Sequence, residues 1–200
     1  IAAVESGFRE FGRSPELNAP RRRITTPEGV RVSVHPGGVP SLGGIGVLAH
    51  AEHVAVSKEV QTYHNMGGPV TVLFDVKDAS LMGMIVGRVG LAEIEAERPT
   101  PMRTAATSAV GTRSLARADS ATLGILGAGG EAKYHLLAFS KVRQFKRVKV
   151  FCRTEKTRDD FCRMMEKIVP CELEPVASAK QAVVDSDVVL TATNSNVAVF

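Results

Sequence analysis

Over the first ninety residues, hydrophobic and polar positions follow two different periods. Apolar side chains recur at helical spacing over residues 1–12, which predicts a short amphipathic helix. Residues 14–23 contain two prolines and predict a loop. From residue 24 to residue 90 the dominant pattern is the alternation that half-buried strands show, so we expect an antiparallel sheet over residues 24–90.

Four stretches of this region predict individual strands. They cover residues 30–34, 53–57, 70–74 and 81–86. The His-Pro-Gly-Gly run at residues 35–38 is expected to end the first strand, and the glycine-rich residues 41–46 predict a tight turn. Residues 75–80 have the polarity of a hairpin loop between the last two strands.

The second half of the chain has a different pattern. An alanine-rich stretch over residues 101–118 predicts one long helix, and Asp119-Ser120 is a plausible joint. Strand and helix patterns then alternate, as in a parallel sheet. The first expected strand begins at Thr122, and three further strands cover residues 148–151, 171–176 and 187–193. The last is apolar enough to predict burial on both faces.

A glycine cluster directly follows the apolar run that begins at Thr122. Gly127 would make the tight turn off the strand, Gly129 would let a pyrophosphate approach the backbone, and Ala132 would let the helix pack on the sheet. The helix N-terminus would present free N–H groups to the phosphates. A second strand begins about 20 residues later, the spacing of a dinucleotide-binding unit. A purely structural turn is the alternative.

The composition is that of an ordinary globular protein, with 44% hydrophobic and 23% charged residues, a net charge of +4 and a pI near 9.1. The basic run at residues 21–23 is too short, and aromatics too few, to indicate nucleic-acid binding. Cys152, Cys162 and Cys171 lack metal-binding spacing and suggest reduced thiols in a cytoplasmic protein with no metal site.

No apolar run approaches the roughly 20 residues that a membrane-spanning helix needs. The first residues show no signal-peptide pattern. Because the chain does not open with Met, we expect a processed or partial chain.

Several motifs, in order along the chain, resemble the ornithine cyclodeaminase/mu-crystallin family. They are Pro20-Arg21, Leu73-Phe74-Asp75, Arg103-Thr104-Ala105-Ala106 followed by Ser108, the glycine turn, and Thr191-Ala192-Thr193-Asn194-Ser195. The resemblance implies an α/β chain in which an antiparallel substrate-binding and dimerisation domain, residues 1–118, precedes an incomplete Rossmann domain, residues 119–200. It also implies a homodimer that binds NAD or NADP and a small amino acid or imine.

The resemblance further implies the roles of individual residues. Arg21 and Arg103 would hold the substrate carboxylate, which a guanidinium matches bidentately, although Arg22 or Arg23 could replace Arg21 in a shifted register. The expected cofactor-binding residues are Thr104, Gly127, Gly129, Gly130, Glu131, Ala132, Arg153, Thr154, Thr191 and Thr193.

The end of the second Rossmann strand predicts which cofactor is preferred. An acidic residue there selects NAD by binding the ribose hydroxyls, whereas an arginine pairs with the 2′-phosphate of NADP. Here Cys152-Arg153-Thr154 follows the strand, and Glu155 is the first acid. We therefore expect NADP to be preferred over NAD.

Two departures from the family concern its catalytic residues. The family's lysine position falls on or near Ala51, and Lys58 is too far along the chain to replace it. His50 and His53 are weak candidates for a proton donor. The family's catalytic aspartate would lie beyond Phe200, so the catalytic residues stay unknown.

The function that the resemblance implies is an NAD(P)-dependent oxidoreductase acting at the α-carbon of an amino acid or a cyclic imine. One alternative is a cyclodeaminase-like lyase that retains NAD. Another is a nucleotide- or ligand-binding protein without catalysis, as mu-crystallin-like proteins can be.

Overall fold

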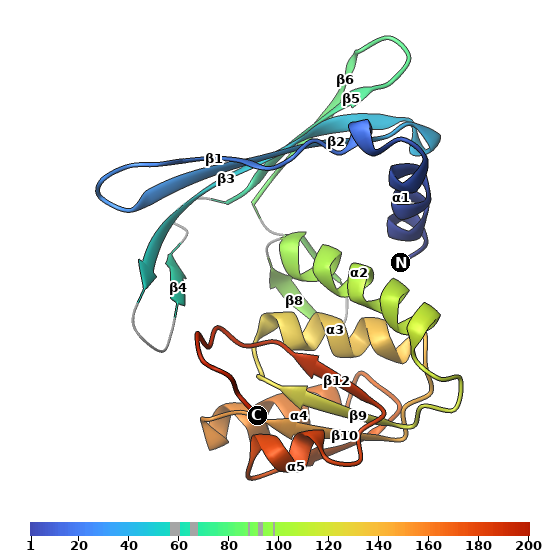
Figure 1. Ribbon diagram of the computed structural model, residues 1–200, viewed down its shortest axis with the longest axis vertical. Coiled ribbons are helices and arrows are strands. Elements are labelled where there is room, and N and C mark those ends of the chain that lie inside the picture. Colours follow the sequence, from blue (N-terminus) through green and yellow to red (C-terminus); the bar gives the residue numbers. More distant parts are fainter. Residues whose placement is uncertain (57–60, 65–67, 88, 92–93, 98) are drawn as a thin grey trace. The chain divides into compact units, whose positions relative to one another are not determined.

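The computed structural model describes residues 1–56, 61–64, 68–87, 89–91, 94–97 and 99–200. Its contacts divide the chain into two compact units. The first, Ala2–Gly90, is called the N-terminal unit below, and Leu91–Phe200 together with Ile1 is called the C-terminal unit. Figure 1 colours the chain from blue to red along the sequence. The expected α/β class, an antiparallel sheet followed by a parallel one, is confirmed.

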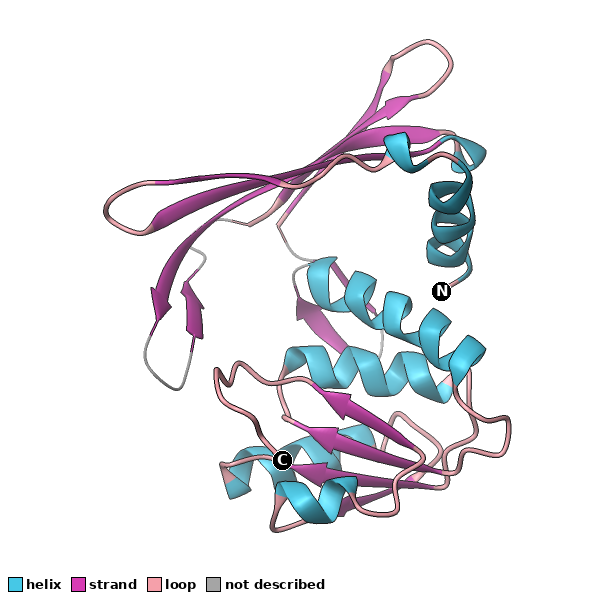
Figure 2. Ribbon diagram, in the orientation of Figure 1, coloured by secondary structure: helices cyan, strands magenta, loops and turns pink. Residues whose placement is uncertain are grey.

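The N-terminal unit is built almost entirely of strands, as Figure 2 shows. Its elements are α1 (Ala2–Arg13), two 3₁₀ turns η1 (Pro15–Leu17) and η2 (Pro40–Leu42), β1 (Arg22–Thr25), β2 (Val30–Val39), β3 (Gly44–Val56), β4 (Gln61–His64), β5 (Val70–Asp75) and β6 (Leu81–Val86). The sheet order is β1-β2-β3-β5-β6, with β4 paired to the end of β3. All of these pairs are antiparallel.

The predicted end of the first strand at residues 35–38 is wrong. β2 continues through Pro36 to Val39, because it stays paired with β3 as far as Gly44. β1 pairs only with Arg31–Val34, so the later part of β2 is an edge on that side, where proline is tolerated. The chain reverses instead at Gly43, whose φ of 79° lies in the left-handed region that glycine favours.

The C-terminal unit alternates strands and helices after one long helix. Its elements are α2 (Pro99–Leu115), β9 (Thr122–Leu126), α3 (Gly130–Ser140), β10 (Arg147–Phe151), α4 (Glu155–Met165), β11 (Glu172–Pro175), α5 (Ala179–Val183) and β12 (Val188–Thr191). β9 to β12 form a parallel sheet in the order β11-β10-β9-β12. The chain moves outward from β9 in one direction and returns to its other side as β12, which creates a topological switch point at β9.

The short β7 (Val89–Leu91) and β8 (Ile94–Glu97) form a separate two-stranded sheet where the chain passes from one unit to the next.

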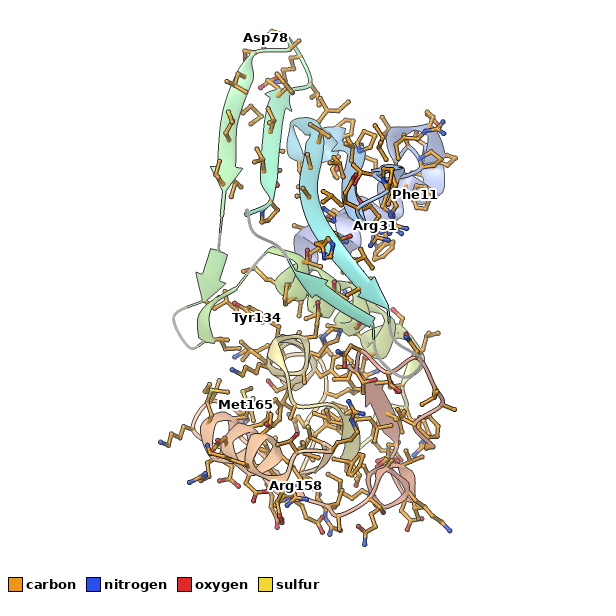
Figure 3. The ribbon with its side chains drawn as sticks, turned by 90° about the vertical axis from the view of Figure 1, so that its left-hand side faces the viewer. Phe11, Arg31, Asp78, Tyr134, Arg158 and Met165 are labelled. Atoms are coloured by element: carbon orange, nitrogen blue, oxygen red, sulfur yellow. The ribbon has the colours of Figure 1, made fainter. Side chains whose placement is uncertain are left out.

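Apolar side chains on both faces of the parallel sheet form the core of the C-terminal unit. On one face, side chains of β9 and β10 pack with α3 and α4, including Tyr134 and Met165, which Figure 3 labels. On the other face, Leu126 packs with Val176 and with Ala182 of α5. A capping box at Ser178 starts α5.

The last strand is less buried than the sequence predicted. In β12 only Leu190 is buried, whereas Val189 is 37% exposed, so burial on both faces is wrong. β12 pairs with β9 alone among the described strands and is therefore an edge of this sheet.

The division by contacts differs from the boundary expected at residues 118 and 119. Helix α2 packs against α3, and its Ala105 and Ala109 are buried in the core of the C-terminal unit. The contacts therefore group residues 91–118 with the parallel sheet. The functional extents of the two domains stay a prediction.

Charged side chains fix the end of α2 against the start of the sheet. The Arg143 guanidinium donates to the carbonyl oxygens of Arg113, Ala116 and Arg117 at the end of the helix. The Asp187 carboxylate accepts from the backbone N–H groups of Thr122 and Ala121 at 2.9 and 2.8 Å. These two hydrogen bonds, together with Arg117, lower the pKa of Asp187.

Candidate functional site

A cleft of about 710 Å³ lies at the carboxyl ends of the parallel strands, within the C-terminal unit. Its walls come from the ends of β9, β10 and β12, from the first turns of α3 and from α2. The sheet order puts this cleft at the switch point beside β9, which is where open α/β sheets bind ligands.

Gly127 makes the turn that leads from β9 into this cleft. Its φ is +105°, and a Cβ atom there would lie 2.1 Å from the carbonyl oxygen of Ala192. Its N–H donates to the carbonyl oxygen of Phe151 at 2.8 Å. Glycine at this position is therefore required by the packing of the turn between β10 and β12.

Gly129 has a different environment. Its φ and ψ of −92° and −170° are open to any residue, and no heavy atom lies within 4 Å of the position that a Cβ would take. It is the N-cap of α3 and, having no side chain, it forms no cap hydrogen bond with the first N–H groups of the helix. The absence of a Cβ therefore leaves space above the helix N-terminus, whose free N–H groups suit a phosphate oxygen.

Nine of the ten residues expected to bind the cofactor line this one cleft. They are Thr104, Gly127, Gly129, Gly130, Glu131, Arg153, Thr154, Thr191 and Thr193. Ala132 does not line it, because its side chain is fully buried where α3 packs on the sheet.

The β10 side of the cleft carries basic and hydroxyl groups. Arg153, Thr154 and Thr157 line it together with Cys152. The first acid after the strand, Glu155, does not line the cleft, and its carboxylate pairs with the Arg158 guanidinium at 3.2 Å. Arg158 lies on α4 and is labelled in Figure 3. This edge therefore fits a phosphate better than it fits two ribose hydroxyls.

Ser108 and His135 also line the cleft, and sequence reasoning did not include them among the site residues. His135 is 5% exposed, with its Nε2 3.1 Å from the Ser108 Oγ and its Nδ1 2.7 Å from the carbonyl oxygen of Glu131. The available signal was helical spacing, because His135 lies one turn after Glu131 on the same face of α3.

The two arginines expected to bind the substrate lie in different units. Arg103 is exposed on α2, next to Thr104, and it does not line the cleft. Arg21 is exposed immediately before β1 in the N-terminal unit, where Arg22 and Arg23 are exposed as well.

The two candidate histidines lie on β3 and make contacts within their own sheet. The ring of His50 stacks on His35, with ring centroids 5.3 Å apart, and its Nε2 is 3.8 Å from Oε1 of Glu52. Glu52 is buried and accepts from Arg31 Nε at 2.9 Å. Figure 3 labels Arg31. These contacts tie His50 to a buried ion pair of the sheet.

His53 has its Nε2 3.0 Å from the carbonyl oxygen of Glu28. Ala51, the expected lysine position, is exposed on β3, and Lys58 lies outside the described residues. Among the residues that the structure describes, no group of histidine, cysteine or acidic side chains could hold a metal ion. No helix in the same ranges could cross a membrane.

The sequence matches the ornithine cyclodeaminase/mu-crystallin family over residues 70–200. The chain belongs to this family. It is 29% identical to the ketimine reductase mu-crystallin of Macropus fuliginosus over 203 residues, which cover 96% of this chain and 58% of that protein. It is 34% identical to a Delta(1)-pyrroline-2-carboxylate reductase of Bacillus cereus over 110 residues, 55% of this chain and 34% of that protein.

The fold of the chain is also that of solved family structures. The probable ornithine cyclodeaminase of Bordetella pertussis superposes with a TM-score of 0.75 at 22% identity, over 98% of this chain and 56% of that protein. The chain therefore spans little more than half the length of its full-length relatives.

Proposed function

We propose that the chain is part of an NADP-dependent oxidoreductase that acts at the α-carbon of an amino acid or a cyclic imine. The observation that carries this proposal is the cleft at the switch point. The N-terminus of α3, with free space above Gly129, lines this cleft together with Arg153 and Thr154. When bound, the nicotinamide supplies the hydride.

The residues of the cleft divide the binding task along the proposed cofactor. The N–H groups at the start of α3 bind the pyrophosphate, and Thr191 and Thr193 at the end of β12 face the half that reacts. Arg153 and Thr154 at the end of β10 bind the 2′-phosphate of the adenosine half. We expect NADP to bind at least about tenfold more tightly than NAD, which corresponds to about 1.4 kcal/mol.

Calorimetric titration of NADPH and NADH into the wild type and into Arg153→Ala tests this choice. The substitution should remove the preference for NADPH while leaving NADH binding nearly unchanged. Lys156→Ala is a matched control, because that side chain is an exposed cation of α4 paired with Asp160 at 2.7 Å. Equal affinity of the wild type for the two cofactors would contradict the preference.

The activities of relatives support the reduction of an imine as the reaction. Two relatives that the chain resembles in sequence are reductases of a ketimine and of a pyrroline carboxylate, which are both imines. We propose that Arg103 and Arg21 bind the carboxylate of such a substrate, because guanidinium and carboxylate form paired hydrogen bonds. Arg103→Ala should therefore raise the KM for the imine more than it changes the Kd for NADPH.

Turnover separates this reaction from the two alternatives in a protein of full family length. A reductase consumes added NADPH with an imine such as pyrroline-2-carboxylate, whereas a cyclodeaminase releases ammonia from a diamino acid without consuming added cofactor. A binding protein binds NADPH and does neither.

We also propose that the family-length protein is a homodimer associated through the N-terminal sheet. On β6 the side chains of Leu81, Met82, Met84, Ile85 and Val86 are all more than 40% exposed. An open sheet with apolar residues on both faces needs cover. Sedimentation should show a dimer at micromolar concentration, and Met84→Glu should weaken it.

The free thiols Cys152, Cys162 and Cys171 fit a cytoplasmic protein.

A further inference from the structure

Two hydroxyl groups on the α2 wall of the cleft have partners for their protons within the protein. Thr104 Oγ1 donates to the carbonyl oxygen of Thr100 at 2.8 Å. Ser108, one turn later, has its Oγ 3.1 Å from His135 Nε2. Because residues four apart lie on one face of a helix, both oxygens belong to the same wall.

The partners of His135 decide the direction of its hydrogen bond with Ser108. Nδ1 lies 2.7 Å from the carbonyl oxygen of Glu131, which can only accept, so Nδ1 carries the proton. In the neutral ring Nε2 is then an acceptor, and the Ser108 hydroxyl must donate to it. The Phe139 and His135 rings pack in a T-shaped arrangement, with centroids 5.9 Å apart, which helps to hold the imidazole in this orientation.

This arrangement gives the α2 wall a chemical character opposite to that of the α3 N-terminus. Helix α3 presents N–H donors, whereas Thr104 and Ser108 have lone pairs left to offer to the cleft. The β10 end, with Arg153, fits the adenosine half of a dinucleotide. The donors on the other half are the carboxamide amino group and the ribose hydroxyls of the nicotinamide nucleoside.

We infer that Ser108 accepts a hydrogen bond from a donor on the nicotinamide half of the dinucleotide, and that His135 is a positioning residue that holds Ser108 as an acceptor. This inference rests on the proposed cofactor binding and assigns a role to two residues of that site. Its consequence is selectivity: the cleft should discriminate against analogues that lack the donor.

The test measures cofactor affinity directly by calorimetry rather than by turnover. NADPH is compared with its 3-acetylpyridine analogue, in which a methyl group replaces the carboxamide amino group. One neutral hydrogen bond corresponds to about a fivefold difference in Kd. If the carboxamide is the donor, the wild type should favour NADPH over the analogue about fivefold, and Ser108→Ala should bind the two equally.

If a ribose hydroxyl is the donor, the wild type should bind the two compounds equally, and Ser108→Ala should weaken both about fivefold. An unchanged NADPH affinity in Ser108→Ala would overturn the inference. Ser114→Ala is the matched control, because this serine is exposed on the same helix, outside the cleft. It should leave both affinities unchanged.

Variants of His135 separate positioning from a general effect on folding. His135→Leu frees the Ser108 proton and should reproduce part of the effect of Ser108→Ala, which is a loss of discrimination if the carboxamide is the donor and weaker binding of both compounds if a ribose hydroxyl is the donor. His135→Gln supplies a carbonyl acceptor in its place and should restore the wild-type affinities for both compounds. Equal behaviour of the two variants would overturn the positioning role. Failure of the wild type to bind NADPH or NADH would overturn the proposed function together with this inference, whereas normal binding by Ser108→Ala overturns the inference alone.

Discussion

The two units of the chain place their hydrophobic side chains in opposite ways. In the described residues, every buried apolar side chain of the core lies at Ile94 or later, in the C-terminal unit. Most of the exposed large apolar side chains lie before residue 90, on α1 and on the antiparallel sheet. The C-terminal unit therefore stabilises itself with a hydrophobic core of its own, whereas the N-terminal sheet leaves much of its apolar surface exposed.

Two methionines test this difference most strongly. Met165 of α4 is fully buried, whereas Met84 of β6 is 59% exposed. Met165→Ala should lower the free energy of unfolding by about 2–5 kcal/mol, the usual cost of removing a buried methionine side chain. Met84→Ala should change it by less than about 0.5 kcal/mol.

Urea unfolding followed by circular dichroism at helical wavelengths measures this contrast, because α2, α3 and α4 belong to the C-terminal unit. The comparison should be made at a concentration at which the protein is monomeric. Equal losses from the two substitutions would show that the N-terminal sheet contributes to the same core.

Two glycines of the cleft give the next contrast, between a residue that folding requires and one that the ligand requires. Gly127→Ala introduces a side chain at positive φ and 2.1 Å from the Ala192 carbonyl oxygen. The positive φ alone should cost about 1–2 kcal/mol. Gly129→Ala should change stability by less than about 1 kcal/mol, because the site is open and its φ is ordinary, and only the lower N-cap preference of alanine opposes the substitution.

The effect of Gly129→Ala should appear in binding instead. A methyl group above the start of α3 blocks the approach of a pyrophosphate, and we expect about a tenfold rise in the Kd for NADPH. Thermal unfolding with and without NADPH separates the two effects. A Gly129→Ala protein that is unstable but binds normally would reverse the assignment of the two glycines.

Cysteine labelling gives a smaller but specific signal. Burial raises the pKa of the Cys162 and Cys171 thiols to about 11. At pH 8 only about one in a thousand of these thiols is the reactive thiolate. Cys152 lines the cleft, so iodoacetamide should modify it first, and NADPH should slow this modification several-fold. Peptide mass spectrometry identifies the site, and equal rates with and without NADPH would place the cofactor elsewhere.

The sequence predicted the strand–turn–helix at Gly127 well, because the apolar run, the glycines and the helical pattern that follows are all local signals of the same structure. The end of β2 was missed, because pairing with β3 outweighs the local turn signal of residues 35–38. Exposure of β12 was missed for a similar reason, since burial depends on how many strands flank it. The hydrophobic pattern of a strand does not by itself show which other strands pair with it.

Within the site, single residues were easier to predict than pairs. Arg153 follows a strand end, which is a position that sequence alone can find. The contact between Ser108 and His135 joins α2 to α3 across 27 positions of sequence, so only packing of the two helices brings it about. The buried network of Glu52 with Arg31 and His50 likewise depends on the register of β2 with β3.

Hydrogen exchange with and without NADPH tests the central claim most directly, that the C-terminal unit binds a dinucleotide in the cleft beside β9. The free N–H groups at the start of α3 should gain phosphate partners. We predict slower exchange over residues 127–132, 152–157 and 191–195, with no slowing on β6. Slowing confined to the N-terminal sheet, or no change at residues 127–132, would contradict this claim.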